Sequence, residues 1–238
     1  MIDIHSHILP GADDGSSSME ETLKMLKQAY DAGITTVIST SHYIEDKYTL
    51  SKKRRETFVS NIQKELDKRD ISVKIYSGAE AYIVPDLDDL YRKKIIPTLA
   101  NSNYVLFELP FTTKVVYLEN VINNLITRKY IPIIAHPERY LYVQEDPNMV
   151  VRLIEKGVLL QANYGSIDGI YGKEAKIALK KLLKMNAIHF LASDIHRADS
   201  IYTRTDSMLR KIERIIGSKK MDQLTQVNPL KIIRHKVW

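Results

Sequence analysis

The sequence predicts an α/β protein in which a mostly parallel sheet closes into a barrel. Short runs rich in β-branched residues alternate along the chain with amphipathic helical patterns, an arrangement typical of parallel strands connected by helices. Seven such β–α units in succession favour a closed or distorted barrel, and an open doubly wound sheet is the alternative. The expected strands are residues 1–5, 35–40, 73–79, 104–109, 131–135, 158–163 and 188–192.

The first helix is marked at both of its ends. Ser18 and Glu21 fit a capping box at the N-terminus, and Gly33 suits the C-terminal cap. The apolar stripe between them consists of Leu23, Leu26 and Tyr30. Further helices are expected near residues 51–69, 86–93, 115–128, 146–156, 173–186 and 203–216.

Composition indicates an ordinary globular protein with one domain, residues 1–238. Hydrophobic residues make up 44% of the 238 residues and charged residues 27%. The formal charge is +6 and the isoelectric point about 9.2, which can indicate an anionic partner. The basic residues are scattered, however, so we expect a solvated surface with some preference for anionic substrates, and no nucleic-acid partner.

The lack of cysteine and of long apolar runs excludes several classes of function. The chain has no cysteine, which excludes disulfides, thiolate metal ligands and a cysteine nucleophile. Its longest apolar runs, such as residues 104–107 and 131–135, are far shorter than the ~20 residues that cross a bilayer. The N-terminus has no signal-peptide pattern, so we expect a cytoplasmic protein without membrane insertion.

Histidines and acidic residues gather at the C-terminal ends of the expected strands. In an α/β barrel those ends converge on one face, so residues distant in sequence become neighbours there. The candidates are His5, His7, Asp14, His42, Glu80, Glu108, His136, Asp194 and His196. Two other histidines, His189 in mid-strand and His235 in the basic tail, are expected to have structural roles.

The spacing and the chemistry of these candidates indicate metal binding. Within the pairs His5–His7 and Asp194–His196 the residues are two apart, so on an extended backbone both side chains face the same way. Imidazole and carboxylate without thiolate suit divalent ions such as Mn, Fe or Zn. Nine candidate ligands exceed what one ion needs, so two or three ions are implied, with a carboxylate bridging some of them.

Each candidate also has an ordinary structural explanation when it is taken alone. A single histidine at a strand end is more often hydrogen-bonded than a ligand, and Asp3 could be a satisfied core acid or a partner of a ligand. Asp13 and Asp14 could form an Asx turn, and Glu108 could be a solvated loop acid. The joint placement at six of seven expected strand ends favours the metal-site interpretation.

A set of short motifs resembles a known superfamily over essentially the whole chain. The motifs are His5-Ser6-His7, Asp13-Asp14-Gly15, Thr40-Ser41-His42, Gly78-Ala79-Glu80, Ala135-His136-Pro137-Glu138-Arg139 and Ala192-Ser193-Asp194-Ile195-His196. Together they resemble the PHP (polymerase and histidinol phosphatase) superfamily. Their order and spacing are similar to those of the bacterial PHP-type protein-tyrosine phosphatases of capsule and exopolysaccharide gene clusters.

The resemblance implies a distorted (β/α)7 barrel of the PHP type with three metal ions. It places His5, His7, Glu80 and Asp194 on the first ion, Glu80 with Glu108 and His136 on the second, and Asp14, His42 and His196 on the third. Mn is the first choice, with Fe, Zn and Mg as alternatives. It also implies that Arg139 contacts phosphate and leaves Arg197 and Arg204 as candidates for a second catalytic arginine.

The implied activity is hydrolysis of phosphotyrosine by metal-activated hydroxide, without a covalent cysteine intermediate. The implied partner is the C-terminal tyrosine cluster of a cognate bacterial tyrosine kinase, in the regulation of capsular or exopolysaccharide synthesis, and homo-oligomerisation stays open. Three other functions are weighed: a histidinol-phosphate phosphatase or other phosphoesterase of the superfamily, a nuclease, and a non-catalytic scaffold that binds the kinase.

Overall fold

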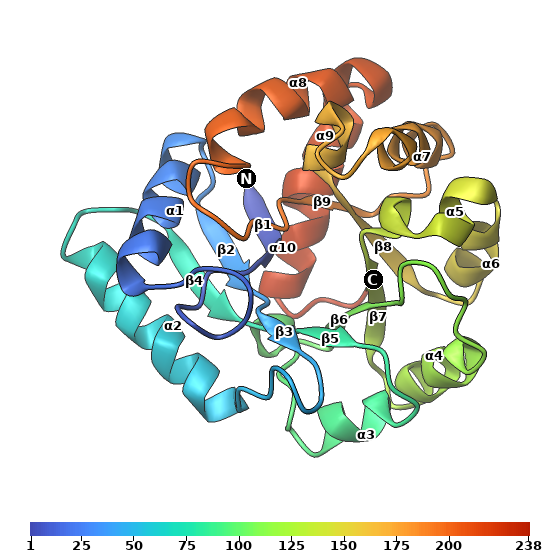
Figure 1. Cartoon of the computed structure of the whole chain (residues 1–238), viewed down its shortest axis with the longest axis horizontal. Coiled ribbons are helices and arrows are strands. Elements are labelled where there is room, and N and C mark those ends of the chain that lie inside the picture. Colours follow the sequence, from blue (N-terminus) through green and yellow to red (C-terminus); the bar gives the residue numbers. More distant parts are fainter.

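Parallel strands form the centre of the molecule and helices surround them in the computed structural model, which describes residues 1–238 (Figure 1). The strands are β1 (Ile2–Ser6), β2 (Thr36–Ser39), β3 (His42–Tyr43), β4 (Lys74–Ser77), β5 (Glu80–Tyr82), β6 (Tyr104–Glu108), β7 (Ile131–Ala135), β8 (Leu159–Asn163) and β9 (Phe190–Ala192). The longer helices are α1 (Met19–Asp31), α2 (Lys52–Asp67), α3 (Leu87–Arg92), α4 (Leu118–Thr127), α6 (Met149–Glu155), α7 (Lys173–Lys184), α8 (Thr205–Ile216) and α10 (Asn228–Ile233). Shorter helical segments are α5 (Leu141–Glu145), α9 (Ser218–Asp222), η1 (Leu99–Asn101), η2 (Pro137–Arg139), η3 (Tyr164–Asp168), η4 (Tyr202–Arg204) and η5 (Gln223–Val227).

The strands close into a barrel because the first and last of them meet. All pairings between named strands are parallel, in the orders β1-β2-β4 and β3-β5-β6-β7-β8-β9. Ser6 forms a parallel bridge with Ile195, just beyond β9, and the N–H of His7 donates to the carbonyl of Ile195 at 2.9 Å. The predicted distorted barrel is therefore confirmed, and the open doubly wound alternative is wrong.

Two of the seven expected strands are each broken into two shorter ones. Residues 35–40 contain β2, with β3 after it, and residues 73–79 contain β4, with β5 after it. At Gly78, between β4 and β5, a Cβ would lie 2.9 Å from Leu99 Cδ2 and 3.0 Å from Ile38 Cγ2. A side chain at this position would crowd two buried core residues, and the chain leaves one sheet before Gly78 and enters the other after it.

The helix predictions hold in outline and differ in detail. Ser18 caps α1 by accepting from the N–H of Glu21 at 3.2 Å, but Glu21 reaches back to Ser17 rather than to Ser18. Tyr30 is exposed, and the buried face of α1 consists of Thr22, Met25, Leu26 and Ala29. The sequence did not predict α5 or the C-terminal segment α9–η5–α10, because their apolar patterns are too short to show a period.

The apolar core has two parts, one inside the barrel and one outside it. The inner cluster includes Ile2, Ile4, Ile38, Leu106, Ile133, Leu159 and Phe190 from the strands, together with Ile232 of α10. Helix α10 contacts β1 and η1 and lies behind the strands in Figure 1, so it closes the end of the barrel where the strands begin. The larger cluster packs the helices against the outer face of the strands. No helix in the structure combines the length and the apolar character that crossing a lipid bilayer requires.

Candidate metal centre

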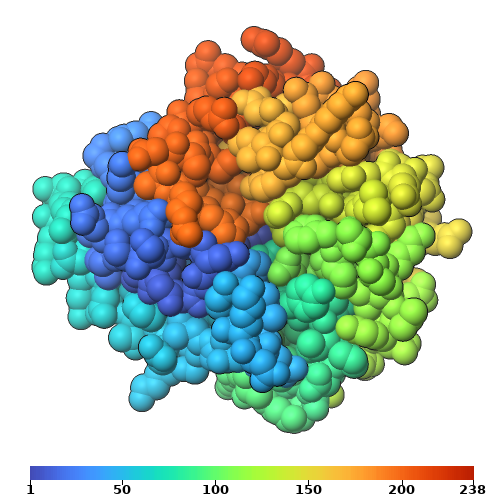
Figure 2. All heavy atoms as spheres, viewed as in Figure 1, coloured from blue at the N-terminus to red at the C-terminus, as the bar shows by residue number.

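The nine predicted residues meet at the end of the barrel where the strands finish. Seven of them line a cavity of about 570 Å³, and His5 and His7 lie beneath it with no exposed surface. In Figure 2 this hollow lies where the loops after β1, β3, β6 and β9 come together, seen as blue, light blue, green and orange atoms. The placement is the one that the strand-end argument predicted.

Local backbone irregularities aim these side chains into the cavity. Neighbouring residues of a regular strand point to opposite faces, and Ile4 points into the barrel. The register of β1 against β2 shifts between Asp3 and Ser6, and this irregularity lets His5 point inward as well. His136 and Asp194 have φ of 32° and 55°, in the left-handed region that non-glycine residues avoid. Such strain is typical of functional positions, where the surrounding structure compensates for it.

The deepest group joins β1, β5 and the end of β9. Nε2 of His5 lies 3.1 Å from Nε2 of His7, 3.1 Å from Glu80 Oε2 and 3.3 Å from Asp194 Oδ1. Nε2 of His7 lies 3.3 Å from each of the same two carboxylate oxygens. A regular tetrahedron with an edge of about 3.2 Å has its centre about 2.0 Å from each corner, which is a normal metal–ligand distance. These four atoms therefore fit one divalent ion.

A second group shares Glu80 with the first. Nδ1 of His42 lies 3.2 Å from Glu80 Oε2 and 3.3 Å from Glu108 Oε1, and these three atoms could hold an ion. His136 lies on the far side of the shared carboxylate, with Nε2 2.9 Å from Glu80 Oε1 and 3.9 Å from Glu108 Oε2. Neither His42 Nδ1 nor Glu80 Oε2 has a hydrogen-bond partner although both are buried, as expected for atoms that coordinate a cation.

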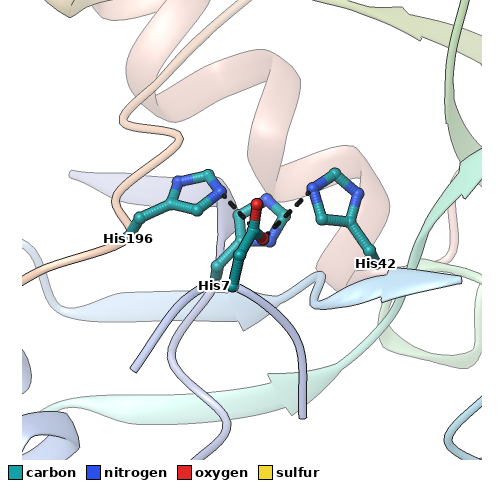
Figure 3. Close-up of side chains that lie close together, drawn as sticks. His7, His42 and His196 are labelled. Atoms are coloured by element: carbon teal, nitrogen blue, oxygen red, sulfur yellow. Dashed lines mark ion pairs between the residues drawn. The ribbon is translucent and has the colours of Figure 1, made fainter. Parts of the chain in front are cut away.

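The third group is nearest to solvent and appears in Figure 3, where His7, His42 and His196 converge. Oδ1 of Asp14 lies 3.6 Å from Nε2 of both His42 and His196, and the two dashed lines mark these ion pairs. The rings of His7 and His196 stack with centroids 4.0 Å apart. His7 and His42 thus each belong to two groups, which the sequence could not predict.

The charges in the site favour cations. Burial alone would lower the pKa of His5, but Glu80 and Asp194 outweigh it and raise the pKa to about 9. Burial would likewise raise the pKa of Glu80, yet His5 and His42 hold it well below its usual range. Glu80 is therefore ionised, which is the form that binds metal ions.

Asp13 is a residue whose role the sequence did not reveal. Its Oδ1 accepts from the N–H of Gly15 at 3.0 Å, which is the Asx turn that was weighed for it. Its Oδ2 accepts from Nδ1 of His7 at 2.7 Å and from the N–H of His42 at 2.7 Å. A Cβ on Gly15 would lie 2.2 Å from the carbonyl oxygen of His7, so only glycine lets this loop fold back onto β1. The sequence feature that could have indicated this role is that the acidic Asp13 directly precedes the candidate ligand Asp14.

The three candidate arginines differ in position. Arg139 Nη1 donates to Asp194 Oδ2 at 2.9 Å, and its guanidinium lies 4.7 Å from the ring centre of Phe111 and 4.4 Å from that of Tyr171. Arg197 lines the cavity and donates to the backbone carbonyls of Gly15 and His196. Arg204 is exposed at the end of η4 and does not line the cavity.

The residues expected to be structural lie outside the cluster. His189 precedes β9 rather than lying within it, and its Nδ1 accepts from the N–H of Leu160 at 3.1 Å. His235 contacts the carbonyl of Ala100 at 3.0 Å. Asp3 is a satisfied core acid, because it accepts from Tyr202 Oη at 2.9 Å and from the N–H of Ser193 at 3.1 Å.

A closed parallel barrel with a histidine–carboxylate cluster at its strand ends defines a class of barrel shared by many hydrolases. A lactonase from Listeria monocytogenes has the same fold, with a TM-score of 0.63 at 13% identity over 99% of this chain and 95% of that chain. A histidinol phosphate phosphatase from Lactococcus lactis matches with a TM-score of 0.57 at 12% identity over 88% of this chain and 93% of that chain. At these identities the likeness concerns the fold alone.

Sequence and structure together assign the chain to a family within this class. Residues 1–234 match the model of the family "Capsular polysaccharide synthesis, CpsB/CapC", and the chain belongs to that family. It is 34% identical to the tyrosine-protein phosphatase YwqE of Bacillus subtilis over 95% of this chain and 89% of that protein. It is 35% identical to the tyrosine-protein phosphatase CpsB of Streptococcus pneumoniae over 98% of each.

A solved structure supports the same assignment at the level of the backbone. It comes from a pair, YwqE from Bacillus subtilis and CpsB from Streptococcus pneumoniae, described as unique metal-dependent tyrosine phosphatases. It matches with a TM-score of 0.94 and 33% identity, covering 100% of this chain and 96% of that chain. The resemblance inferred from the motifs is therefore confirmed.

Proposed function

We propose that the protein is a metal-dependent protein-tyrosine phosphatase that acts on the tyrosine cluster of a bacterial tyrosine kinase in capsule or exopolysaccharide synthesis. The observation that carries this proposal is the convergence of nine histidine and acidic residues beneath a cavity with Arg139 at its edge. The names of the relatives and the family description support it.

We assign all nine residues as metal ligands. Eight belong to the three groups described above, and His136 joins them through its 2.9 Å contact with the shared carboxylate of Glu80. The donor set of imidazoles and carboxylates suits Mn, Fe or Zn, and we retain Mn as the first choice. When bound, two or three such ions would offset the charge of a phosphoryl group and supply a nucleophilic water at neutral pH.

The arginines supply the phosphate contacts in this proposal. The guanidinium of Arg139 is fixed between two aromatic rings and one carboxylate, so little reorganisation is needed when it donates to a phosphoryl oxygen. Arg197 is the second candidate because it also lines the cavity, and Lys47 adds an exposed cation at the same wall. These cations would attract an acidic phosphorylated tail.

The walls of the cavity suit an aromatic leaving group. They include the aromatic and aliphatic side chains of Ile44, Tyr48, Tyr82, Phe111, Ile170, Tyr171 and Ile201. The phenol of tyrosine has a pKa of about 10, far below that of an alkyl alcohol, so the phenolate can leave with little help from a general acid. The absence of cysteine requires a route without a thiol nucleophile.

The test is phosphate release from a phosphotyrosyl peptide with added Mn²⁺ and with a chelator. We expect release that the chelator abolishes and that exceeds release from histidinol phosphate. His136→Ala should lose at least tenfold in rate, whereas the exposed His235→Ala should retain the wild-type rate. Faster hydrolysis of histidinol phosphate would contradict the substrate assignment. Metal binding without hydrolysis of any phosphate ester would favour the alternative of a non-catalytic scaffold that binds the kinase.

A further inference from the structure

Strand β8 corresponds to the one expected strand, of seven, at whose end the sequence places no histidine or acid. It carries two amides instead, Gln161 and Asn163, and neither side chain has exposed surface. Leu159, two residues earlier, belongs to the cluster inside the barrel, so all three side chains face inward. Figure 1 shows β8 between β7 and β9, and β9 in turn lies beside β1, so β8 is close to the end of β1.

These amides connect two of the proposed ligands through a continuous chain of hydrogen bonds. Asp194 Oδ2 accepts from Asn163 Nδ2 at 2.6 Å, and Asn163 Oδ1 accepts from Gln161 Nε2 at 2.8 Å. Gln161 Oε1 then lies 2.7 Å from Nδ1 of His5. The same Asp194 oxygen also accepts from Arg139, so the chain runs from the arginine to the deepest histidine.

The direction of every bond in the chain follows from its carboxylate end. An ionised carboxylate only accepts, so Asn163 must turn its NH₂ toward Asp194 and its oxygen toward Gln161. Gln161 must then donate to Asn163 and present its own oxygen to His5. An oxygen has no proton to give, so Nδ1 of His5 must carry the proton.

We infer that Gln161 and Asn163 are positioning residues that fix the tautomer of His5 and the orientation of Asp194 for metal binding. With one proton held on Nδ1, Nε2 is the nitrogen that would give up its proton and offer its lone pair to an ion shared with Glu80 Oε2 and Asp194 Oδ1, the oxygens 3.1 and 3.3 Å away. With Oδ2 engaged by Asn163, Oδ1 of Asp194 is left for the ion. The inference rests on the metal site proposed above.

Amides suit this task better than acids in this site. Glu80, Asp194 and Asp13 already bring three negative charges to His5 and His7. A fourth carboxylate at the end of β8 would face Asp194 at hydrogen-bond distance, and two like charges there would repel each other. The two amides orient His5 and Asp194 without adding charge. Through the same hydrogen bonds, the orientation of His5 depends on that of Asp194 and of Arg139.

The test compares two substitutions at one position. Gln161→Met keeps the volume and removes the acceptor, so we expect the Zn²⁺ affinity, measured by competition with a chelator, to fall 10–100-fold, roughly the effect of losing such a partner. Gln161→Glu keeps an acceptor for His5 but cannot donate to Asn163, so its Zn²⁺ affinity should fall between those of the wild type and Gln161→Met. A purely structural role would instead make the buried charge of Gln161→Glu the more harmful of the two changes. Asn228→Leu, which removes a buried amide that contacts only the carbonyl of His189, is the matched control and should bind Zn²⁺ normally.

A spectroscopic measurement makes the outcome independent of activity. In the Zn²⁺-loaded protein, ¹⁵N shifts of the histidine rings should show His5 protonated at Nδ1 and metal-bound at Nε2. Equal Zn²⁺ affinity in the wild type and Gln161→Met, or a His5 ring protonated at Nε2, would overturn the inference while leaving the proposed function intact. A wild-type protein that binds neither Zn²⁺ nor Mn²⁺ would overturn both. If Gln161→Met does not fold, Asn163→Ser interrupts the same chain and should weaken Zn²⁺ binding about tenfold.

Discussion

Asp13 and His7 are joined by a hydrogen bond of 2.7 Å between two side chains without exposed surface. The same carboxylate oxygen accepts from the N–H of His42, so Asp13 holds two proposed ligands on two different strands. The neighbouring Asp14 is half exposed and reaches the solvent side of the cluster. Two adjacent aspartates thus have different roles.

We expect Asp13→Ala to reduce both metal affinity and stability. The variant leaves His7 without its orienting acceptor, so metal affinity should fall about 10–100-fold. It also leaves three donors without their acceptor, Nδ1 of His7 and the N–H groups of His42 and Gly15, which should cost roughly 1–3 kcal/mol for each buried one. Asp14→Ala should change the free energy of unfolding by less than about 0.5 kcal/mol. Urea unfolding and chelator competition on both variants check the prediction, and equal behaviour of the two would contradict it.

Arg139→Ala should lower the rate of phosphotyrosine hydrolysis roughly 10–1,000-fold, on the scale of removing one transition-state donor. Arg139→Lys should recover little, because an ammonium lacks the planar donor fork and cannot stack between Phe111 and Tyr171. The exposed Arg204→Ala is the control and should keep the wild-type kcat and KM. Unchanged kinetics in Arg139→Ala would leave this arginine only its structural ion pair with Asp194.

The sequence predicted the barrel and the nine clustered residues because both depend on local patterns. Strand-like runs and the residues that follow them can be found without knowing which strands are neighbours. The ion groups could not be found in this way, because His42 approaches Glu80 and Glu108 only after β3 separates from β2 and pairs with β5. The new neighbours of β3 come from segments distant in sequence, which local patterns do not reveal.

The residues that hydrogen-bond to the proposed metal ligands were harder still to predict. Gln161 and Asn163 are common residues with no distinctive spacing, and their role appears only when β8 is placed beside β9 and opposite His5. Arg139 was expected from the resemblance to contact phosphate. In the structure its acidic partner is Asp194, which is 55 residues away in sequence.

Arg55 in α2 is fully buried, and we expect its removal to destabilise the fold strongly. Its guanidinium donates to the carbonyls of Ser41, His42 and Leu50 at 2.6, 2.7 and 2.9 Å, so it fixes the backbone on both sides of β3. Arg55→Ala should lower the free energy of unfolding by roughly 3–5 kcal/mol, since three buried acceptors lose a charged donor.

The neighbouring Arg54 supplies the control for this prediction. Its side chain is exposed, so Arg54→Ala should change the free energy of unfolding by less than about 0.5 kcal/mol. Arg55→Lys, which keeps the charge but not the three-way geometry, should fall between the two. Urea unfolding of the three variants at neutral pH gives the comparison, and a small effect of Arg55→Ala would show that water replaces the guanidinium.

His189 should make the protein less stable in mild acid. Burial and the nearby Lys220 lower its pKa from 6.5 to about 4 in the folded state. Between these two values the unfolded chain binds a proton that the folded chain does not, so stability is complete above pH 6.5 and declines as the pH falls toward 4. The full loss would be roughly 3 kcal/mol, at 1.36 kcal/mol for each pH unit.

His189→Asn isolates this contribution, because an amide oxygen can still accept from the N–H of Leu160 but does not titrate. The difference in unfolding free energy between the wild type and His189→Asn should be constant above pH 6.5 and should shift in favour of the variant at lower pH. Taking the difference cancels the titration of the carboxylates and histidines in the metal site, which both proteins share. A difference that stays constant down to pH 4 would mean that the fold does not lower the pKa of His189, which would contradict the prediction.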